Sequence, residues 1–319
     1  MALCADDLER VNALIADRMA SEHAPRIPEV TRHLVEAGGK RLRPLLTLAA
    51  ARLCGCEGDA HVKLAATVEF IHTATLLHDD VVDESAQRRG RPTANLLWDN
   101  KSSVLTGDYL FARAFQLMVE TDNLRVLGIL SDAAATIAEG EVMQLATAGD
   151  LSTGEAAYLR MIHGKTAALF AAATEVGAVI AGEPEPRIDA LRDYGRTLGM
   201  AFQIVDDLLD YGGAAASMGK NTGDDFREGK VTLPVLLAWE AGDAEARAFW
   251  RRVIEKSDQQ EADLAEALAR MTETGALAET ERRARAYCAE ARAALAAFPP
   301  SPARDALDGI AEFVVARLS

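Results

Sequence analysis

Hydrophobic residues recur along most of the chain at spacings of three and four, with polar residues between them. This period matches the turn of an α-helix, so the pattern predicts a protein built almost wholly of helices. Runs of β-branched residues at a spacing of two are lacking, and we therefore expect no β-sheet. The predicted helices span residues 6–21, 28–37, 43–53, 61–83, 103–119, 124–147, 153–181, 186–211, 233–241, 244–256, 260–274, 277–297 and 301–318.

Three polar, glycine-rich segments interrupt the helical pattern: EAGGKRLRP, DESAQRRGRPTAN and YGGAAASMGKNTGDDFREGK. The third is a long loop between two predicted helices, and long loops in compact folds are usually functional or disordered. No linker rich in proline, serine or charge divides the sequence, and no repeat of solenoid length recurs. We therefore expect one all-helical domain spanning residues 1–319.

Composition supports the helical prediction, because alanine is very frequent and is the best helix former. The formal charge of the 319-residue chain is −15, and its pI is near 4.9. Such acidity argues against nucleic acid or an anionic membrane as a partner. It also makes any local cluster of lysine and arginine informative.

The four cysteines are Cys4, Cys54, Cys56 and Cys288. No second cysteine or histidine pair lies at the spacing of a zinc site, so we expect free thiols in a reducing compartment. No signal peptide opens the sequence, and no uncharged apolar run reaches the length of a membrane span. These features predict a soluble cytoplasmic protein without a transmembrane segment.

The stretch LLHDDVVD places Asp79, Asp80 and Asp83 within five residues, directly behind an apolar run. On a helix, Asp79 and Asp83 share one face with their Cβ atoms roughly 6 Å apart, where like charges destabilise the helix. We therefore expect a positive charge to compensate the repulsion between these carboxylates. Taken alone, this cluster could equally be a solvated acidic helix end.

The stretch FQIVDDLLDY repeats the spacing and the apolar lead-in with Asp206, Asp207 and Asp210. Two such helices in one helical domain can face each other across a cavity. Carboxylate oxygens suit Mg²⁺, which keeps several waters and bridges a few carboxylates to phosphate oxygens. Neither cluster has the loop pattern or the glycine of a calcium-binding EF-hand. The two motifs together predict a magnesium site.

Basic residues gather near both acidic motifs, and arginine forks and lysine point charges are the usual phosphate ligands. Each alone could be an ordinary surface charge, but their joint placement favours a phosphate-bearing partner. The candidates are Lys40, Arg41 and Arg43 in GGKRLRP, Arg88, Arg89 and Arg91 in QRRGRP, Lys165 with Thr166 in HGKTA, and Lys220 and Lys230 in the long loop.

These segments together resemble the trans-isoprenyl diphosphate synthase family. The matching pieces occur in family order over residues 38–238, and no catalytic position departs from the family pattern. They are GGKRLRPLL, FIHTATLLHDDVVDESAQRRGRPTAN, GDYLFARAF, GKTAALF, GMAFQIVDDLLDY and GKNTGDDFREGKVTLPVLLA, and RDALDGIAEFVVAR near the end also fits. The resemblance implies an all-α bundle around a deep central cavity, usually in a homodimer, that adds isopentenyl diphosphate to an allylic diphosphate.

The resemblance also implies roles for individual residues. Asp79 and Asp83 would hold two Mg²⁺ ions, Asp206 with Asp210 would hold a third, and Asp80 and Asp207 would support them. The allylic diphosphate, farnesyl or geranylgeranyl, would contact Arg88, Lys165, Thr166, Gln203, Lys220 and Lys230. The diphosphate of isopentenyl diphosphate would contact Lys40, Arg43, His72 and Arg89.

Product length should depend on the helix wall below the first motif. Ala74 and Thr75 lie about one turn, or roughly 5 Å, before Asp79, and short-chain family members place an aromatic residue there. The small side chains favour a long product of octaprenyl to decaprenyl length, as in synthases that make the side chain of ubiquinone. Phe115, Met118 and Met143 are candidates for the cavity floor, although ordinary core positions explain them as well.

Four alternatives remain open. A short-chain farnesyl or geranylgeranyl diphosphate synthase shares the chemistry and differs in product length. A terpene cyclase fits less well, because the second motif is again D-D-x-x-D. A metal-dependent phosphohydrolase could use His78 and Asp79 but would need further histidine ligands, and we expect His78 to be a packed residue or one that supports the motif. A non-catalytic subunit of a two-component synthase would be expected to lose some of the acidic or basic residues.

Overall fold

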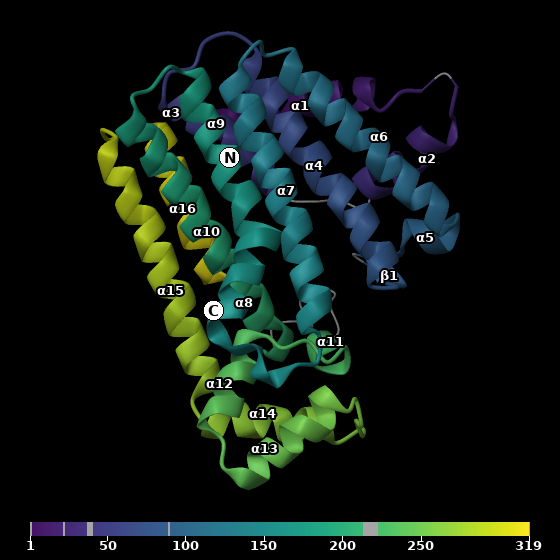
Figure 1. Cartoon of the computed structure of the whole chain (residues 1–319). Helices are drawn as coiled ribbons and strands as arrows, with labels where there is room; N and C mark the ends of the chain where they lie inside the picture. The colour runs from purple at the N-terminus through teal and green to yellow at the C-terminus, as the bar shows by residue number, and fades with distance from the viewer. Residues whose placement is uncertain (1, 22, 37–40, 89, 213–222, 319) are drawn as a thin grey trace. The chain divides into compact units, whose positions relative to one another are not determined.

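The computed structural model describes residues 2–21, 23–36, 41–88, 90–212 and 223–318, and it is almost wholly helical (Figure 1). The predicted all-α fold class is therefore confirmed. Most predicted helices begin and end within three residues of the observed bounds. The elements are η1 (Ala2–Cys4), α1 (Ala5–Arg18), α2 (Arg26–Glu36), α3 (Leu42–Leu53), α4 (Ala60–Val82), β1 (Gln87–Arg88), β2 (Arg91–Pro92), α5 (Ala94–Leu97), α6 (Asn100–Val119), α7 (Leu124–Thr147), η2 (Leu151–Thr153), α8 (Gly154–Ile162), η3 (His163–Ala167), α9 (Ala168–Ile180), α10 (Glu185–Tyr211), α11 (Asp224–Arg227), α12 (Leu233–Ala241), α13 (Ala244–Trp250), η5 (Arg251–Glu255), α14 (Asp263–Glu273), α15 (Ala276–Ala294), η6 (Leu295–Ala297) and α16 (Pro302–Ala316).

Contacts between residues divide the chain into two compact units, which we describe separately. The first unit comprises residues 1–134, 169–195 and 294–308. Its α4 packs against α1, α3 and α6. Residues 64–71 of α4 are all buried, and a helix that is buried on every side needs no polar face. This central helix carries the first aspartate motif at its C-terminal end.

The second unit comprises residues 135–168, 196–293 and 309–319. Its α12 packs against α8, α13 and α14. The side chains of Tyr211, Phe226, Trp250 and Met271 fill a buried apolar cluster between these helices. Tyr211 ends α10, so this core anchors the helix that carries the second aspartate motif. The prediction of one domain over residues 1–319 stays a prediction.

The expectation of no β-sheet is wrong in one short segment. The strands β1 and β2 pair antiparallel, with Gln87 opposite Pro92 and Arg88 opposite Arg91. Gly90 between them has a φ of +74°, a conformation that tight hairpin turns require and that glycine adopts without strain. A strand of two residues is too short to show an alternation of polar and apolar positions, so the sequence pattern could not predict β1 and β2.

Two predicted helices are interrupted by π-helical turns. The helix expected over residues 153–181 is α8, the π-helix η3 and α9 in succession. The helix expected over residues 244–256 ends in the π-helix η5. A π-turn contains one extra residue, and the segments before and after it keep the spacing of an α-helix. The hydrophobic pattern alone therefore could not locate the π-turns.

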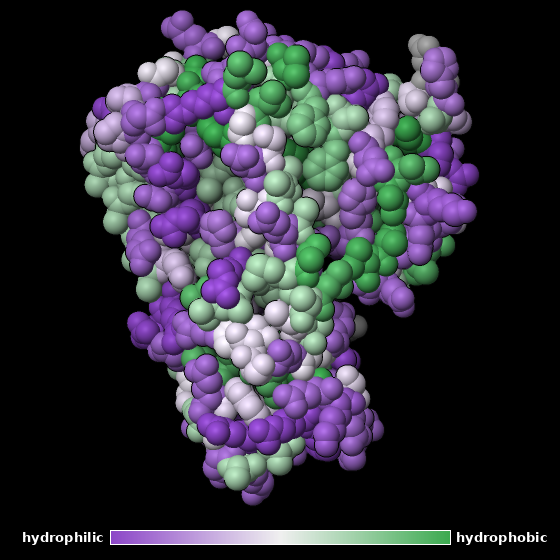
Figure 2. Space-filling view, viewed as in Figure 1, coloured by the Kyte–Doolittle hydropathy of each residue, from purple (hydrophilic) through white to green (hydrophobic). Residues whose placement is uncertain are grey.

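The surface of α6 carries exposed hydrophobic side chains. Leu105 and Val119 are each 65% exposed, and Val104 and Phe115 are also exposed. Their spacing places all four within roughly 100° of one helix face, and Figure 2 shows hydrophobic residues at the surface over α6. Contiguous exposed apolar residues of this kind commonly mark a contact with another protein.

Within the described residues, no helix combines the length and the apolar character that crossing a membrane requires.

Candidate active site

The first aspartate motif lies at the C-terminal end of α4, where Asp83 is the capping residue. The helix dipole makes negative charge at this end unfavourable by roughly 0.3–1 kcal/mol for each carboxylate. Asp79 is partly exposed and Asp83 is exposed. Carboxylates that oppose the dipole and reach solvent are suited to bind a cation, because the cation would remove the penalty.

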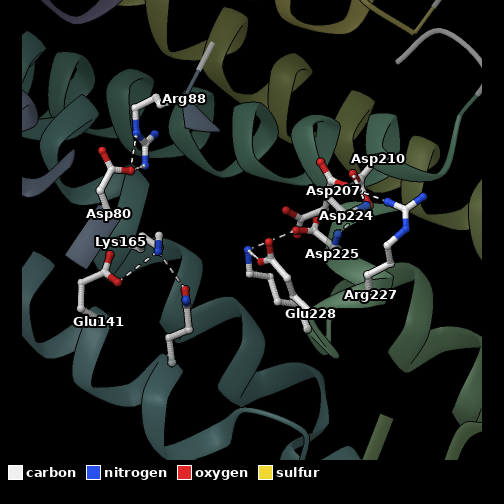
Figure 3. Close-up of polar contacts among 12 residues, drawn as sticks. Asp80, Arg88, Glu141, Lys165, Asp207, Asp210, Asp224, Asp225, Arg227 and Glu228 are labelled. Atoms are coloured by element: carbon white, nitrogen blue, oxygen red, sulfur yellow. Dashed lines mark hydrogen bonds and ion pairs between the residues drawn. The ribbon is translucent and has the colours of Figure 1, made fainter. Parts of the chain in front are cut away.

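Asp80, the middle residue of this motif, is completely buried. Its Oδ1 atom lies 2.8 Å from both Nε and Nη2 of Arg88, and Figure 3 shows the two side chains pointing toward one another. Its Oδ2 atom is buried and has no hydrogen-bond partner in the described part of the chain. Burial raises the pKa of Asp80, and the guanidinium of Arg88 opposes that rise. Asp80 and Arg88 are thus brought together, and Asp80 fixes Arg88 beside the first motif.

The second aspartate motif lies at the C-terminal end of α10 and has a buried middle residue of its own. Asp207 is 5% exposed. The hydroxyl of Tyr158 donates to Asp207 Oδ2 at 2.6 Å, and Gln203 Nε2 donates to Asp207 Oδ1 at 2.8 Å. Thr166 Oγ1 donates to Gln203 Oε1 at 2.8 Å. Burial, together with the negative charge of Asp225, raises the pKa of Asp207 to about 7.

Asp210 is held by the segment that follows the long loop. Its carboxylate accepts hydrogen bonds from the backbone N–H of Asp224 at 3.2 Å and of Asp225 at 3.0 Å (Figure 3). Burial and the charge of Asp225 raise the pKa of Asp210 to about 6. The side chains of Asp224 and Asp225 add negative charge to this motif. The sequence analysis missed their role, although they follow one another directly in GDDFREGK.

Asp206 is paired with an arginine that the sequence analysis also missed. Arg317 Nη2 lies 3.1 Å from Asp206 Oδ1, and the guanidinium carbon of Arg317 lies 5.1 Å from the ring centroid of Phe202. The Arg317 side chain is only 11% exposed. A cation on Asp206 must therefore share this carboxylate with Arg317 or displace it. The only sequence signal is that Arg317 ends the family-like stretch RDALDGIAEFVVAR.

Lys165 and Thr166 lie in the π-helix η3 of the second unit. Lys165 Nζ is 3.0 Å from Glu141 Oε2 and 3.0 Å from Gln144 Oε1, both on α7 (Figure 3). Lys230 forms ion pairs with Asp225 and Glu228. Of the residues predicted to contact the allylic diphosphate, the structure thus brings Thr166 and Gln203 into contact, and it pairs Lys165 and Lys230 with acidic partners.

Two of the residues predicted to bind isopentenyl diphosphate are in contact within the first unit. Arg43 Nη1 lies 3.1 Å from His72 Nε2, and the guanidinium carbon of Arg43 lies 4.8 Å from the ring centroid of Phe170. Arg41 forms an ion pair with Glu69. Lys40 and Arg89, the other residues predicted for isopentenyl diphosphate, lie outside the described residues, as does Lys220, which was predicted for the allylic diphosphate.

The remaining predictions concern α4, α6 and α7. Ala74 is fully buried, whereas Thr75 is partly exposed. Met118 is buried and Met143 is partly buried, while Phe115 is 44% exposed and lines an open surface depression with Arg18 and Val119.

His78 Nε2 lies 3.1 Å from the carbonyl oxygen of Val104 and 3.5 Å from Asp108 Oδ1, as expected for a packed histidine.

No group of three or more acidic, histidine or cysteine side chains in the described residues is close enough together to enclose a metal ion. Mg²⁺ needs no such enclosure, because it retains waters and takes one or two carboxylates together with phosphate oxygens. The exposed or partly exposed carboxylates of Asp79, Asp83 and Asp206 fit that kind of binding, whereas Asp210 is 6% exposed. The assignment of Asp79, Asp83, Asp206 and Asp210 as ligands, and the facing of the two motifs across a central cavity, stay predictions.

Comparison with known proteins identifies the family. The family model described as Polyprenyl synthetase matches residues 24–271. The crystal structure of a decaprenyl diphosphate synthase from Rhodobacter capsulatus aligns with a TM-score of 0.97 at 66% identity, covering 100% of this chain and 98% of that one. A polyprenyl synthase from Caulobacter crescentus CB15, complexed with calcium and isoprenyl diphosphate, aligns with a TM-score of 0.95 at 54% identity, covering 100% and 97%. Octaprenyl diphosphate synthase of Escherichia coli (strain K12) is 46% identical over 99% of this chain and 97% of its own length. As the resemblance of its motifs indicates, the chain belongs to the polyprenyl synthetase family.

Proposed function

We propose that the chain is a long-chain all-trans polyprenyl diphosphate synthase, a prenyltransferase that adds isopentenyl diphosphate head to tail to an allylic diphosphate. Similar proteins that match it over nearly their full length are decaprenyl and octaprenyl diphosphate synthases. The observation that carries the proposal is the construction of the two aspartate motifs. Each ends a helix at its negative pole and buries its middle carboxylate on hydrogen-bond donors, so each is suited to receive cations.

Mg²⁺ is the proposed cofactor, with Asp79 and Asp83 as ligands in the first motif and Asp206 with Asp210 in the second. The similar polyprenyl synthase from Caulobacter crescentus is complexed with calcium and isoprenyl diphosphate, which supports a divalent cation as the cofactor. When bound, magnesium would neutralise the charge that develops on the leaving diphosphate. Asp80 and Asp207 keep the supporting role that the family resemblance implies, and each is buried on donors of its own unit.

The basic and polar residues bind and orient the two substrates. Those proposed for the allylic diphosphate are Arg88, Lys165, Thr166, Gln203, Lys220 and Lys230. Those proposed for isopentenyl diphosphate are Lys40, Arg43, His72 and Arg89. Fixed donors of this kind stabilise charge where it develops, because they need no reorganisation during the reaction.

The reaction itself is a substitution at the allylic carbon. The C–O bond of the allylic diphosphate breaks, and its electron pair leaves with pyrophosphate. The double bond of isopentenyl diphosphate attacks the allylic cation and forms a new C–C bond. Loss of a proton from the neighbouring carbon then gives the new trans double bond. The departing pyrophosphate is the proposed acceptor of that proton.

The proposed products are of octaprenyl to decaprenyl length and would supply the side chain of a quinone such as ubiquinone. Ala74 and Thr75 leave the wall of α4 without an aromatic side chain one turn before Asp79. A short-chain farnesyl or geranylgeranyl diphosphate synthase is the second candidate, since it would use the same motifs. The small wall residues favour the longer product.

A homodimer is the proposed assembly, and α6 is the proposed contact. The exposed Leu105, Phe115 and Val119 on one face of this helix would be covered by a second copy of the chain. The cytoplasmic location expected from the sequence stays a prediction.

The experiment that tests the function is an elongation assay with the purified full-length chain. The protein is incubated with Mg²⁺, farnesyl diphosphate and labelled isopentenyl diphosphate, and the hydrolysed products are sized by chromatography. We expect products of octaprenyl to decaprenyl length, and none after chelation of the metal. Products that stop at farnesyl or geranylgeranyl length would identify a short-chain synthase. An inactive, folded chain would indicate a non-catalytic subunit.

A further inference from the structure

The π-helix that contains Lys165 directs neighbouring side chains to different helices. A π-turn accommodates one extra residue, which offsets the positions after it by roughly 100° from a continuous α-helix. Thr166 donates to Gln203 on α10, whereas Lys165 reaches Glu141 and Gln144 on α7. Such turns are frequently found at functional sites. The interruption of the helix therefore determines which groups surround the Lys165 ammonium.

The π-helix approaches α7 closely because two glycines meet where the backbones cross. A Cβ atom on Gly140 would lie 2.7 Å from the backbone nitrogen of Lys165 and 3.0 Å from the carbonyl carbon of Gly164. A Cβ atom on Gly164 would lie 3.0 Å from the carbonyl oxygen of Thr136. Neither position accommodates a side chain without displacing backbone. Glu141, which follows Gly140, is thereby placed within reach of Lys165.

The ammonium of Lys165 has two acceptors on α7, each 3.0 Å away: Glu141 Oε2 and Gln144 Oε1 (Figure 3). Glu141 and Gln144 are three residues apart and share one helix face. An ammonium group has three N–H donors. Within the described part of the chain no third acceptor lies within hydrogen-bond distance of Nζ. One donor is therefore left over, on a side chain that is 25% exposed.

The hydrogen-bond partner of the Glu141 carboxylate is the ammonium of Lys165. Its Oε1 atom is buried and has no hydrogen-bond partner among the described residues, and its side chain is 20% exposed. A partly buried carboxylate whose bonded partner is one ammonium acts mainly on that ammonium, by fixing its position and by offsetting its charge. Both effects matter if an anion approaches the remaining N–H donor.

We propose that Glu141 and Gln144 are positioning residues for the transfer reaction, and that they act through Lys165. They hold its ammonium so that a single N–H donor is presented to the diphosphate, and the charge of Glu141 limits how tightly the released pyrophosphate is held. The inference rests on the proposed function in one respect, the assignment of Lys165 to the allylic diphosphate.

The simpler explanation is an ion pair that only ties the π-helix to α7. The two explanations differ in the effect of charge. If the ion pair is merely structural, Glu141→Gln changes stability and leaves anion binding per folded molecule unchanged. If Glu141 restrains Lys165, the same substitution leaves the ammonium without its negative partner and strengthens the binding of pyrophosphate.

The test uses inorganic pyrophosphate as the probe, titrated calorimetrically into the full-length protein with Mg²⁺. For Glu141→Gln we expect pyrophosphate to bind more tightly by roughly tenfold, the size expected for one charged hydrogen bond. In the elongation assay kcat and the KM for the allylic substrate should both fall, because the product leaves more slowly. Gln144→Glu, which adds a second carboxylate to the ammonium, should weaken pyrophosphate binding. Glu139→Gln, an exposed position on the same helix, is the matched control and should change neither quantity.

A double-mutant cycle shows whether Glu141 acts through Lys165. In a Lys165→Met background, Glu141→Gln should change the pyrophosphate Kd by less than about twofold. Equal effects in both backgrounds, or a Glu141→Gln variant indistinguishable from Glu139→Gln, would overturn the inference. So would a loss of pyrophosphate binding that only parallels a loss of thermal stability. Failure of the wild-type protein to elongate any substrate would contradict the proposed function instead, and the binding cycle would remain interpretable.

Discussion

The two aspartate motifs share a spacing but stabilise their middle carboxylates by different means. Asp80, in the first motif, is buried against the guanidinium of Arg88. Asp207, in the second, is buried against the neutral donors of Tyr158 and Gln203, with the charge of Asp225 close enough to raise its pKa. A fixed cation therefore compensates the carboxylate of Asp80, whereas the hydrogen-bond partners of Asp207 within the described residues are neutral.

This difference indicates how each motif responds to an incoming metal ion. The first motif already contains a charge that balances its middle carboxylate, so we expect an incoming cation to act on its outer carboxylates, Asp79 and Asp83. The second motif concentrates several carboxylates around Asp207, and burial raises the pKa of Asp210 to about 6. It should therefore bind protons near neutral pH when no metal is present. We expect metal binding to the second motif to be the more sensitive to pH.

The largest expected effect is the loss of an outer carboxylate from either motif. Asp79→Ala and Asp206→Ala should each lower turnover by roughly 10²-fold or more, the scale seen when one group that stabilises a transition state is removed. The fold should remain intact, because Asp79 is partly exposed and the Asp206 side chain is 31% exposed, although Asp206→Ala also removes the ion pair of Arg317 and should cost more stability than Asp79→Ala. Elongation rates and circular dichroism measure the two quantities. Asp6→Asn, on the exposed face of α1, is the control, and near-normal rates in either alanine variant would contradict the assigned roles.

The second prediction compares how much stability is lost when each middle carboxylate loses a partner. Arg88→Met leaves a buried carboxylate without its cation and should lower the free energy of unfolding by roughly 3 kcal/mol. Tyr158→Phe keeps the ring and removes one donor, so we expect a smaller loss of about 1–2 kcal/mol. Chemical denaturation of both variants measures the difference. The controls are Arg91→Met on the exposed strand β2 and Tyr287→Phe; equal losses for Arg88→Met and Tyr158→Phe would remove the distinction between the motifs.

The third prediction concerns the pH dependence of stability without metal. The folded-state pKa values of Asp207, about 7, and Asp210, about 6, are raised, so the folded protein binds more protons than the unfolded chain. The free energy of unfolding should therefore fall as pH rises from about 4, where the unfolded carboxylates ionise, until the pH exceeds about 7. Denaturation curves at a series of pH values, with the metal chelated, measure this slope.

Asp207→Asn should flatten that slope, because the amide does not titrate. Asp80→Asn should flatten it less, since Arg88 opposes the rise in the pKa of Asp80. If stability depended on pH in the same way in both variants, the proposed difference between the two motifs would be contradicted.

The smallest expected effect on rate comes from the wall of α4. Thr75→Phe should shorten the product with little loss of turnover, because an aromatic ring one turn before Asp79 would close the path of the growing chain. Ala74→Phe should also shorten it, but Ala74 is completely buried, and the larger side chain should cost roughly 1–3 kcal/mol of stability. Chromatography of the products measures chain length. If both variants gave the wild-type products, the argument from the small wall would be wrong.

The sequence predicted the helices well because each long helix has its own periodicity, as α4, α7 and α10 illustrate. The sequence also located both aspartate motifs. It did not predict the hydrogen bond between Thr166 and Gln203, although the family pattern assigned both residues to the allylic diphosphate. It could not predict that Tyr158 binds Asp207 or that Arg317 binds Asp206. These partners are 49 and 111 residues apart in sequence, and nothing in their local pattern records the contact.

The crossing of Gly140 and Gly164 also limits how this enzyme can be redesigned. A helix contact made through side chains can be repacked with larger or smaller residues, so its spacing is adjustable. At this crossing a side chain on either glycine would displace backbone atoms, so the distance between the two backbones cannot be adjusted by exchanging side chains. Variation in chain length or substrate preference should therefore be sought at other positions, while libraries that diversify either glycine should return mostly proteins with a displaced Lys165.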